Sequence, residues 1–316
     1  MQRFILNPIL SKEFRSRMRS WKSPLVISLY LGTLALITIA YYWVKQKNMM
    51  YSGFGPNVGP EIYVVLTVFQ LLLVSFVTPA FTAGVINGER ERQTFDLLTC
   101  TPLSATSIVL NKLFASISYI FLLIIASLPA FGVVYFFGGV LLSEIVQVFI
   151  IYLVTALTFG TIGIFCSAIF KRTQVSMVVS YIIVFIFLIG TLLVTVFLQG
   201  MHSGAYPVGQ RTVPLIIYLN PLIALFSIFP AYGIPYFVSD IIQQIFYRNG
   251  MAAAGIQTIA PWQYNFIING IIVIILLVAT IILIDPVGRF SRFKSKRAKQ
   301  EQKVEDSKDE QVGISG

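Results

Sequence analysis

Charged, sulfur-containing and imidazole side chains are scarce in this sequence. Only 11% of the 316 residues are charged, two are cysteines, and His202 is the single histidine. Soluble domains carry about 25% charged residues, so the composition excludes an ordinary soluble domain. His202 has no cysteine or second histidine near it, which excludes a zinc-like ligand spacing. Cys100 and Cys166 both fall near the cytoplasmic face in the topology derived below, so we expect no structural disulfide.

Motifs for nucleotide binding and catalysis are also lacking. The sequence contains no G-x-x-x-x-G-K-[ST] phosphate-binding loop, no G-x-S-x-G elbow and no H-E-x-x-H or E-x-x-H metal pair. We therefore predict that the chain is not an enzyme and that it binds no metal or cofactor itself.

Apolar residues are what the sequence has in quantity, at 56% of the chain, with a mean hydropathy of +0.81. They gather in six runs without a charged residue: 24–44, 62–86, 113–137, 148–170, 175–198 and 262–284. A helix needs about 20 residues to cross the core of a bilayer. We predict an all-α integral membrane protein with six transmembrane helices, in which Pro79 and Pro129 kink the second and third.

The absence of charge inside the runs bears on function. Ion-coupled carriers usually keep Asp, Glu, His or Arg within their spans, because the coupling ion needs a charged or titrating partner there. None of the six runs contains such a residue. Energy for any active transport is therefore expected from another subunit.

Basic residues orient the chain. With the N-terminus inside, nineteen Lys and Arg residues fall in cytoplasmic segments and four in outside segments. This asymmetry follows the positive-inside rule and predicts that both termini are cytoplasmic. The net charge of +10 then serves orientation and contact with anionic lipid. No nucleic-acid motif accompanies it, so we expect no nucleic-acid partner.

Residues 1–23 have an amphipathic pattern. Asn7 can cap a helix, Pro8 suits its first position, and apolar residues recur at helical spacing as far as Trp21. Basic residues lie mostly on the other faces. The pattern predicts an interfacial helix lying on the membrane. The alternative is a basic juxtamembrane segment that only sets the topology.

Two further segments lie around the last span. Residues 199–261 hold short apolar pieces broken by prolines, and we interpret them as outside or re-entrant short helices. Two additional spans in this region would preserve the same topology. Residues 286–316 turn from basic to acidic with few apolar side chains, which predicts a disordered cytoplasmic tail after a transmembrane domain formed by residues 1–285.

The polar segment 88–112, between the second and third runs, is the best candidate for a binding site. Both signs of charge fall within one helical turn, and Phe95 and Leu98 lie three residues apart on one face. Pro102 ends this piece. A short helix with an apolar centre and a charged rim can dock to a soluble partner. The alternative is a solvated loop whose charges only satisfy the topology.

This segment resembles the cytoplasmic loop of ABC-2 type permeases, the membrane subunits of many bacterial ATP-driven exporters. The residues that carry the resemblance are Glu89, Glu91, Thr94, Asp96, Leu97, Leu98, Thr101, Pro102, Ser104 and Lys112. Gln93 stands where many members have glycine. The N-terminus is similar to the opening of one branch through Asn7, Pro8, Lys12, Glu13 and Arg15, and Asn220-Pro221-Leu222 resembles a motif before the last span.

The resemblance implies a role for each of these segments. Residues 89–99 would form a coupling helix docked on a separate ABC ATPase subunit, which would bind ATP and Mg²⁺. The residues implied at this contact are Glu89, Arg90, Glu91, Arg92, Thr94, Phe95, Asp96 and Leu98. The helix that includes Asn7, Pro8, Lys12, Glu13, Arg15 and Trp21 would lie beside the ATPase. Residues 199–261 would line or cover the exit path.

The resemblance also implies an assembly and a location. Six spans make half of such a transporter, so a second permease copy is expected, either identical or similar, in the plasma membrane. Two other functions remain open at this point: a nucleotide-independent carrier or channel, and a membrane scaffold that recruits a cytoplasmic partner through the same polar segment. Exporters of lipids, peptide antibiotics, sodium and polysaccharides share such sequences, so no substrate is implied.

Overall fold

The computed structural model describes residues 22–52, 58–94, 105–136, 138–202, 215–229 and 260–284. These residues form helices and no strands. Six of the helical segments are long and apolar enough to cross a membrane, which confirms the six predicted spans. The helices are α2 (Lys22–Ser52), α3 (Val58–Thr82), α4 (Asn87–Glu91), α6 (Ala105–Ala126), α7 (Leu128–Phe136), α8 (Leu142–Ile169), α9 (Thr173–Phe185), η1 (Ile186–Gly190), α10 (Thr191–His202), η3 (Leu215–Leu219), α11 (Pro221–Phe226) and α13 (Pro261–Ile284).

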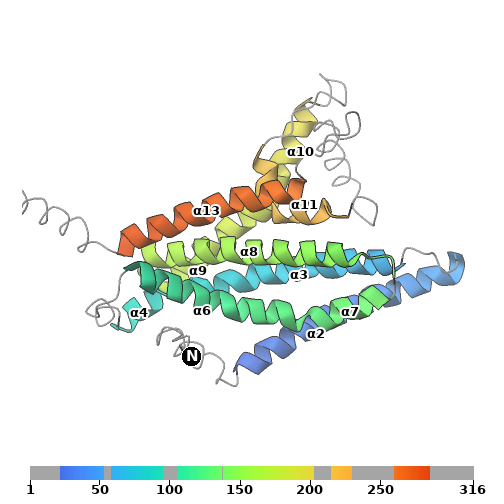
Figure 1. The fold of residues 1–316 in the computed structure, drawn as a ribbon, viewed down its shortest axis with the longest axis horizontal. Helices are drawn as coiled ribbons and strands as arrows, with labels where there is room; N and C mark the ends of the chain where they lie inside the picture. The colour runs from blue at the N-terminus through green and yellow to red at the C-terminus, as the bar shows by residue number, and fades with distance from the viewer. Residues whose placement is uncertain are drawn as a thin grey trace, which may run out of the picture.

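Helix α8 is the centre of the bundle. It lies between α13 and α6 in Figure 1, packs closely on α3, and is the most buried of the six spans. Glycines in α8 allow the close approach to α3. A Cβ atom on Gly163 would overlap Thr82 Oγ1 and lie 2.9 Å from Thr82 Cβ, so no larger residue fits there without moving a helix.

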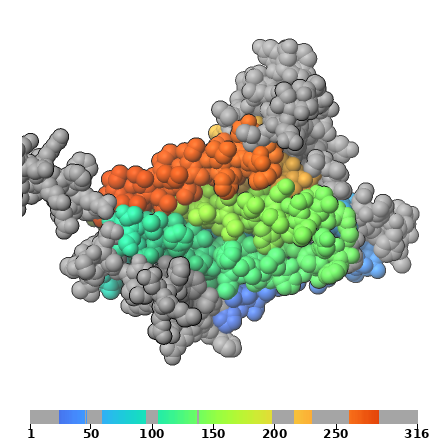
Figure 2. Space-filling model, in the orientation of Figure 1, coloured from blue at the N-terminus to red at the C-terminus, as the bar shows by residue number. Residues whose placement is uncertain are grey.

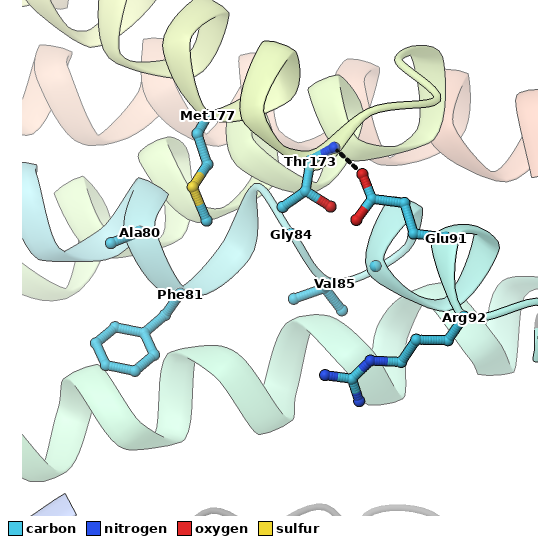
Figure 3. Close-up of a pocket in the computed structure, with 9 residues that line it drawn as sticks. Ala80, Phe81, Gly84, Val85, Glu91, Arg92, Thr173 and Met177 are labelled. Carbon is cyan, nitrogen blue, oxygen red and sulfur yellow. Dashed lines mark hydrogen bonds between the residues drawn. The ribbon is translucent and has the colours of Figure 1, made fainter. Parts of the chain in front are cut away.

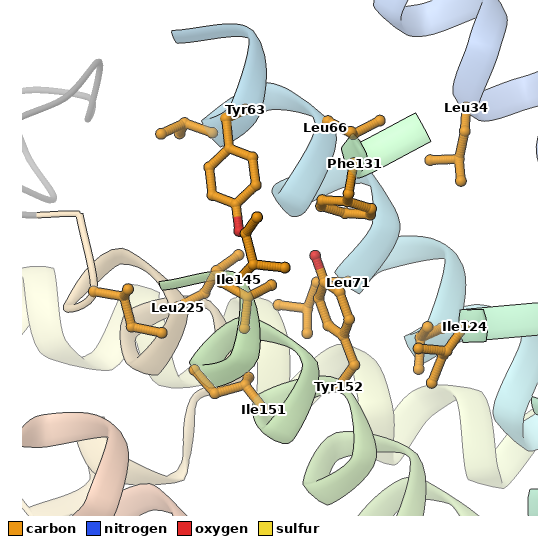
Figure 4. Close-up of a cluster of buried hydrophobic side chains, with 14 of the residues drawn as sticks. Leu34, Tyr63, Leu66, Leu71, Ile124, Phe131, Ile145, Ile151, Tyr152 and Leu225 are labelled. Atoms are coloured by element: carbon orange, nitrogen blue, oxygen red, sulfur yellow. The ribbon is translucent and has the colours of Figure 1, made fainter. Parts of the chain in front are cut away.

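The hydrophobic core lies between α3, α7, α8 and α11. Tyr63 of α3 packs edge-on against Phe131 of α7 and Phe229 just after α11, with ring centroids 5.8 and 5.3 Å apart. Figure 4 shows Tyr63, Phe131 and Tyr152 converging with Leu71 and Ile145. These aromatic contacts join elements that are far apart in the sequence.

The third span is a broken helix. Pro79 remains inside α3 as predicted, but near Pro129 the chain breaks at Ser127, between α6 and α7. Proline has no N–H to donate to the carbonyl four residues before it, and its ring crowds that carbonyl. Ser127 Oγ donates to Ile124 O at 2.7 Å and accepts from Gln70 Nε2 at 2.9 Å. The kink predicted at Pro129 is therefore a break, stabilised by polar side chains from within the bundle.

The outer surface of the bundle is apolar. Figure 2 shows α13 running along the visible face of the bundle. This helix exposes Ile271, Ile274, Ile275 and Ile282. Helix α2 likewise exposes Leu29, Leu36, Ile39 and Trp43. Lipid tails are the solvent that such surfaces suit, so exposed apolar side chains here agree with a membrane-embedded bundle.

Several predicted segments lie outside the described residues. They include the interfacial helix with Asn7, Pro8, Lys12, Glu13, Arg15 and Trp21, the residues Phe95, Asp96 and Leu98, and the tail 286–316. Within region 199–261, the described residues after α10 are 215–229, which include η3 and α11, and Ala260 and Pro261 at the start of α13. The position of this region outside the membrane stays a prediction.

Candidate functional site

Helix α4 contains the first residues of the polar segment 88–112, of which the structure describes 88–94 and 105–112. It follows α3 after a turn and ends in a Schellman motif, in which Gln93 N–H donates to Arg90 O (3.1 Å) and Thr94 N–H donates to Glu89 O (3.0 Å). Gln93 has a positive φ of 57°, a conformation that glycine adopts most easily. The helix predicted over 89–99 is therefore wrong as a continuous element, because α4 ends at Glu91 and the chain turns at Gln93.

Helix α8 holds the start of α4 through Ser167. The Ser167 hydroxyl accepts from the backbone N–H groups of Ile86 (2.8 Å) and Asn87 (3.1 Å) and donates to Asn87 Oδ1 (3.1 Å). Ser167 and Asn87 are both fully buried. Arg90 Nη1 donates to Ala168 O at 2.9 Å. This carbonyl belongs to the last turn of α8, where carbonyls lack helical partners and a cation is favourable.

Helix α9 contacts the same short helix through its N-terminus. Glu91 Oε1 accepts from the Thr173 backbone N–H at 2.7 Å, as Figure 3 shows. The Glu91 carboxyl is exposed and lies beyond the apolar run that ends at Ile86. Its pKa is lowered mainly by the hydrogen bond from the Thr173 backbone N–H, and further by a hydrogen bond from the Thr173 side chain. Arg172, at the N-cap of α9, makes no side-chain capping bond. Glu91 therefore caps α9 from another helix.

Helix α6 completes the attachment with an ion pair. Lys112 Nζ lies 2.6 Å from Glu89 Oε1 and also donates to Val85 O at 3.3 Å. The Lys112 side chain is 4% exposed and that of Glu89 is 28% exposed. A lysine buried to this degree requires an anionic partner, because an unpaired buried charge is costly. The turn between α3 and α4 is thus fixed to α6 as well.

We call Asn87, Glu89, Arg90, Glu91, Lys112, Ser167 and Thr173 the anchor cluster. It joins the end of α3 to α6, α8 and α9 at one end of the bundle. Three of the charges predicted to form a docking rim, Glu89, Arg90 and Glu91, bind this chain's own helices. Arg92 and Thr94 are exposed, and Figure 3 shows the Arg92 side chain directed away from Thr173. Contact of these residues with an ATPase stays a prediction.

Sequence reasoning missed Asn87, Ser167 and Thr173 as members of this cluster. Each is a small polar residue beside or inside an apolar run, where serine and threonine commonly bond to their own helix. Their pairing across 80 or more residues leaves no local pattern. Lys112 was recognised only through the family resemblance. The sequence signal that could have identified Lys112 as a member of this cluster is its position, one residue before an apolar run, in α6.

A second polar feature lies in the fifth span, where η1 is a π-helix between α9 and α10. Asn220 Nδ2 donates to Leu188 O and to Thr191 Oγ1, each at 2.8 Å, and Asn220 Oδ1 accepts from Leu222 N–H at 2.8 Å. Asn220 thus caps α11 and also satisfies a carbonyl within the π-helix. Pro221 takes the first helical position. The Asn-Pro motif singled out in the sequence has this structural basis.

The described residues contain no group of three or more His, Cys, Asp or Glu side chains arranged to hold a metal ion. The chemistry of the anchor cluster is that of hydrogen bonds and ion pairs between helices.

Comparison with protein families identifies a family for this chain. The model of the ABC-2 family transporter protein matches residues 7–296, which is most of the chain and includes all six spans. Comparison with curated proteins gives no match. Together with six apolar helices in one bundle, the family match shows a multi-pass membrane protein with a role in transport. The chain belongs to the ABC-2 transporter family.

Proposed function

We propose that this chain is the permease subunit of an ATP-driven exporter. It forms the translocation path as a dimer with an identical or similar permease, and a separate ATPase subunit binds ATP and Mg²⁺. The polar segment after the second span couples the two subunits. Family membership supports the transport role, and the lack of a phosphate-binding loop in the sequence supports a separate source of energy.

The anchor cluster is the observation that carries this proposal. Four of the five residues of α4 bind three other helices, α6, α8 and α9, through contacts of 2.6 to 3.1 Å. These four residues are Asn87, Glu89, Arg90 and Glu91. A force applied to the chain just after Thr94 would therefore move α3, α6, α8 and α9 together. Rigid-body movement of packed elements is a common way to switch between two states.

The positive-inside rule supports the orientation. Lys171 and Arg172 lie between α8 and α9, at the same end of the bundle as α4. Basic residues gather on the cytoplasmic side of a membrane, so this end faces the cytoplasm in our proposal. Both termini then lie on that side as well, and the host membrane is the plasma membrane.

Purification from native membranes in mild detergent tests the proposal. Mass spectrometry of the proteins retained in fixed proportion should identify one with a phosphate-binding loop, and differently tagged copies should show whether two permeases associate. A chain that purifies alone and well folded would favour the carrier or channel. Retention of a cytoplasmic protein without such a loop would favour the scaffold.

Substitutions at the predicted docking residues sharpen the test. Phe95→Glu with Leu98→Glu should release the ATPase and abolish ATP-dependent transport, because charged side chains cannot fill an apolar groove. Phe95→Leu with Leu98→Met is the matched control and should retain both. Unchanged ATP-dependent transport in the charged variant would contradict the proposed coupling site.

A further inference from the structure

A groove of about 450 Å³ opens beside α4, between the end of α3 and the start of α9. Its lining is apolar in one part and polar in the other, as Figure 3 shows. Ala80, Phe81 and Met177 line one part, and Glu91, Arg92 and Thr173 line the other. The apolar part belongs to two membrane-spanning helices, α3 and α9, and the polar part lies at the start of α9 and in α4 with the residue that follows it. Such a groove has the same polarity as a lipid molecule at the membrane surface.

The polar part presents one charge of each sign. Glu91 and Arg92 are both exposed, and their side chains extend in different directions from neighbouring positions. One Glu91 oxygen, Oε1, accepts from Thr173 N–H, which fixes the position of the carboxylate. The Arg92 guanidinium can bind a phosphate through two parallel hydrogen bonds. A zwitterion that carries both a phosphate and an ammonium group complements this pair.

The base of the groove is kept open by a glycine. A Cβ atom on Gly88 would meet no atom of the described residues within 4 Å, so none of these residues fills the space above Gly88. Gly88 lies in α4, where a larger residue is compatible with the helix. A leucine at this position would fill the groove and leave Glu91 and Arg92 in place.

We propose that this groove binds one zwitterionic phospholipid with a primary ammonium group, of the phosphatidylethanolamine class. Arg92 binds the phosphate, Glu91 binds the ammonium group, and an acyl chain lies over Phe81 and Met177. The lipid fills the space between α3, α4 and α9, next to the anchor cluster. This inference goes beyond the proposed function and does not depend on the presence of an ATPase.

Native mass spectrometry of the full chain tests it. The protein in detergent is mixed with equal amounts of phosphatidylethanolamine and phosphatidylglycerol. The detergent is then removed in the mass spectrometer, and the lipid that stays bound to the protein is identified by its mass. Wild type should retain one phosphatidylethanolamine in preference. Arg92→Gln should weaken its retention by about tenfold or more, the loss expected for one charge-assisted contact. Glu91→Gln should remove the preference for the ammonium lipid, because the neutral side chain still accepts from Thr173 but no longer attracts a cation.

Two further variants separate the groove from general surface charge. Gly88→Leu should lose the lipid although both charged residues remain. Lys171→Gln removes one charge from an exposed residue at the same end of the bundle that does not line the groove, and it should behave as wild type. Thermal denaturation of each variant checks that it is folded.

Three results would overturn the proposal. The first is equal retention of both lipids by wild type, which would mean that the groove does not select an ammonium headgroup, or retention of neither, which would mean that it takes another occupant such as a segment of this chain. The second is an equal loss in Lys171→Gln and Arg92→Gln. The third is full retention by folded Gly88→Leu, which would place the lipid elsewhere. None of these results bears on whether an ATPase associates, so this inference and the proposed function can fail separately.

Discussion

Replacing Ser167 with alanine tests whether α8 holds α4 in place. The Ser167 hydroxyl is the acceptor for two backbone N–H groups, those of Ile86 at 2.8 Å and Asn87 at 3.1 Å. Ser167, Ile86 and Asn87 are all 0% exposed, so water has little access to the site. Alanine removes one oxygen atom and leaves two buried donors without that acceptor.

The expected cost follows from these two donors. A buried polar group without a partner costs about 1–3 kcal/mol, so with two such donors we expect Ser167→Ala to reduce the free energy of unfolding by roughly 2–6 kcal/mol. Each kcal/mol lowers the Tm of a chain of this size by about 2 °C, so the Tm in detergent should fall by about 4–12 °C. Hydrogen exchange should also become faster in residues 83–94 than in the rest of the bundle, since local opening of α4 becomes easier.

Ser118→Ala is the matched control. Its hydroxyl is exposed and donates to Phe114 O within the same helix, at 2.6 Å. No contact between helices is lost, so the Tm should change by less than about 1 °C. If Ser167→Ala matches Ser118→Ala in both Tm and exchange of residues 83–94, then α8 does not hold α4 and the argument for coupled movement fails.

Three other substitutions test separate features by thermal denaturation. Gln93→Gly should raise the Tm by about 2 °C, because glycine adopts the positive φ without a strain of roughly 1 kcal/mol. Gly163→Ala should lower it by about 2–6 °C, since the new methyl group overlaps Thr82 and overpacking costs about 1–3 kcal/mol. Tyr63→Phe should raise it by about 2 °C, since the hydroxyl is buried without a hydrogen-bond partner among the described residues and its desolvation costs about 1 kcal/mol. A shift of opposite sign would contradict the feature tested.

The six spans could be predicted because their signal is local. A run of about 20 residues without charge is rare outside membranes, and each of the six runs is long enough. The order of helices follows directly. The sequence also predicted that Pro79 stays within a helix and that the third span bends near Pro129, but the hydrogen bond that stabilises the break at Ser127 comes from Gln70, 57 residues away. A contact of that length has no local signature.

The anchor cluster could be predicted only in part, for the same reason. The charges of Glu89, Arg90 and Glu91 indicated a solvated or docking face, since charge runs usually face water or a partner. Their partners are two backbone groups and one lysine on other helices, and a backbone group is invisible in a sequence. The departure from glycine at Gln93 did mark the position where α4 ends, because that position needs a positive φ.

The contacts of the anchor cluster limit which residues of the polar segment a partner could bind without breaking bonds within this chain. Because Glu89, Arg90 and Glu91 bind this chain, a partner that displaced them would have to break an ion pair with buried Lys112 and hydrogen bonds at the ends of α8 and α9. Binding beyond Thr94 would cost none of these contacts. It would instead leave α4 as a rigid connection between the docked segment and the spans. If the polar segment couples to an ATPase as proposed, these contacts favour transmission through an intact anchor cluster over its remodelling. Ser167→Ala then separates the attachment of α4 from docking, since it removes contacts of α4 and leaves Phe95 and Leu98 unchanged.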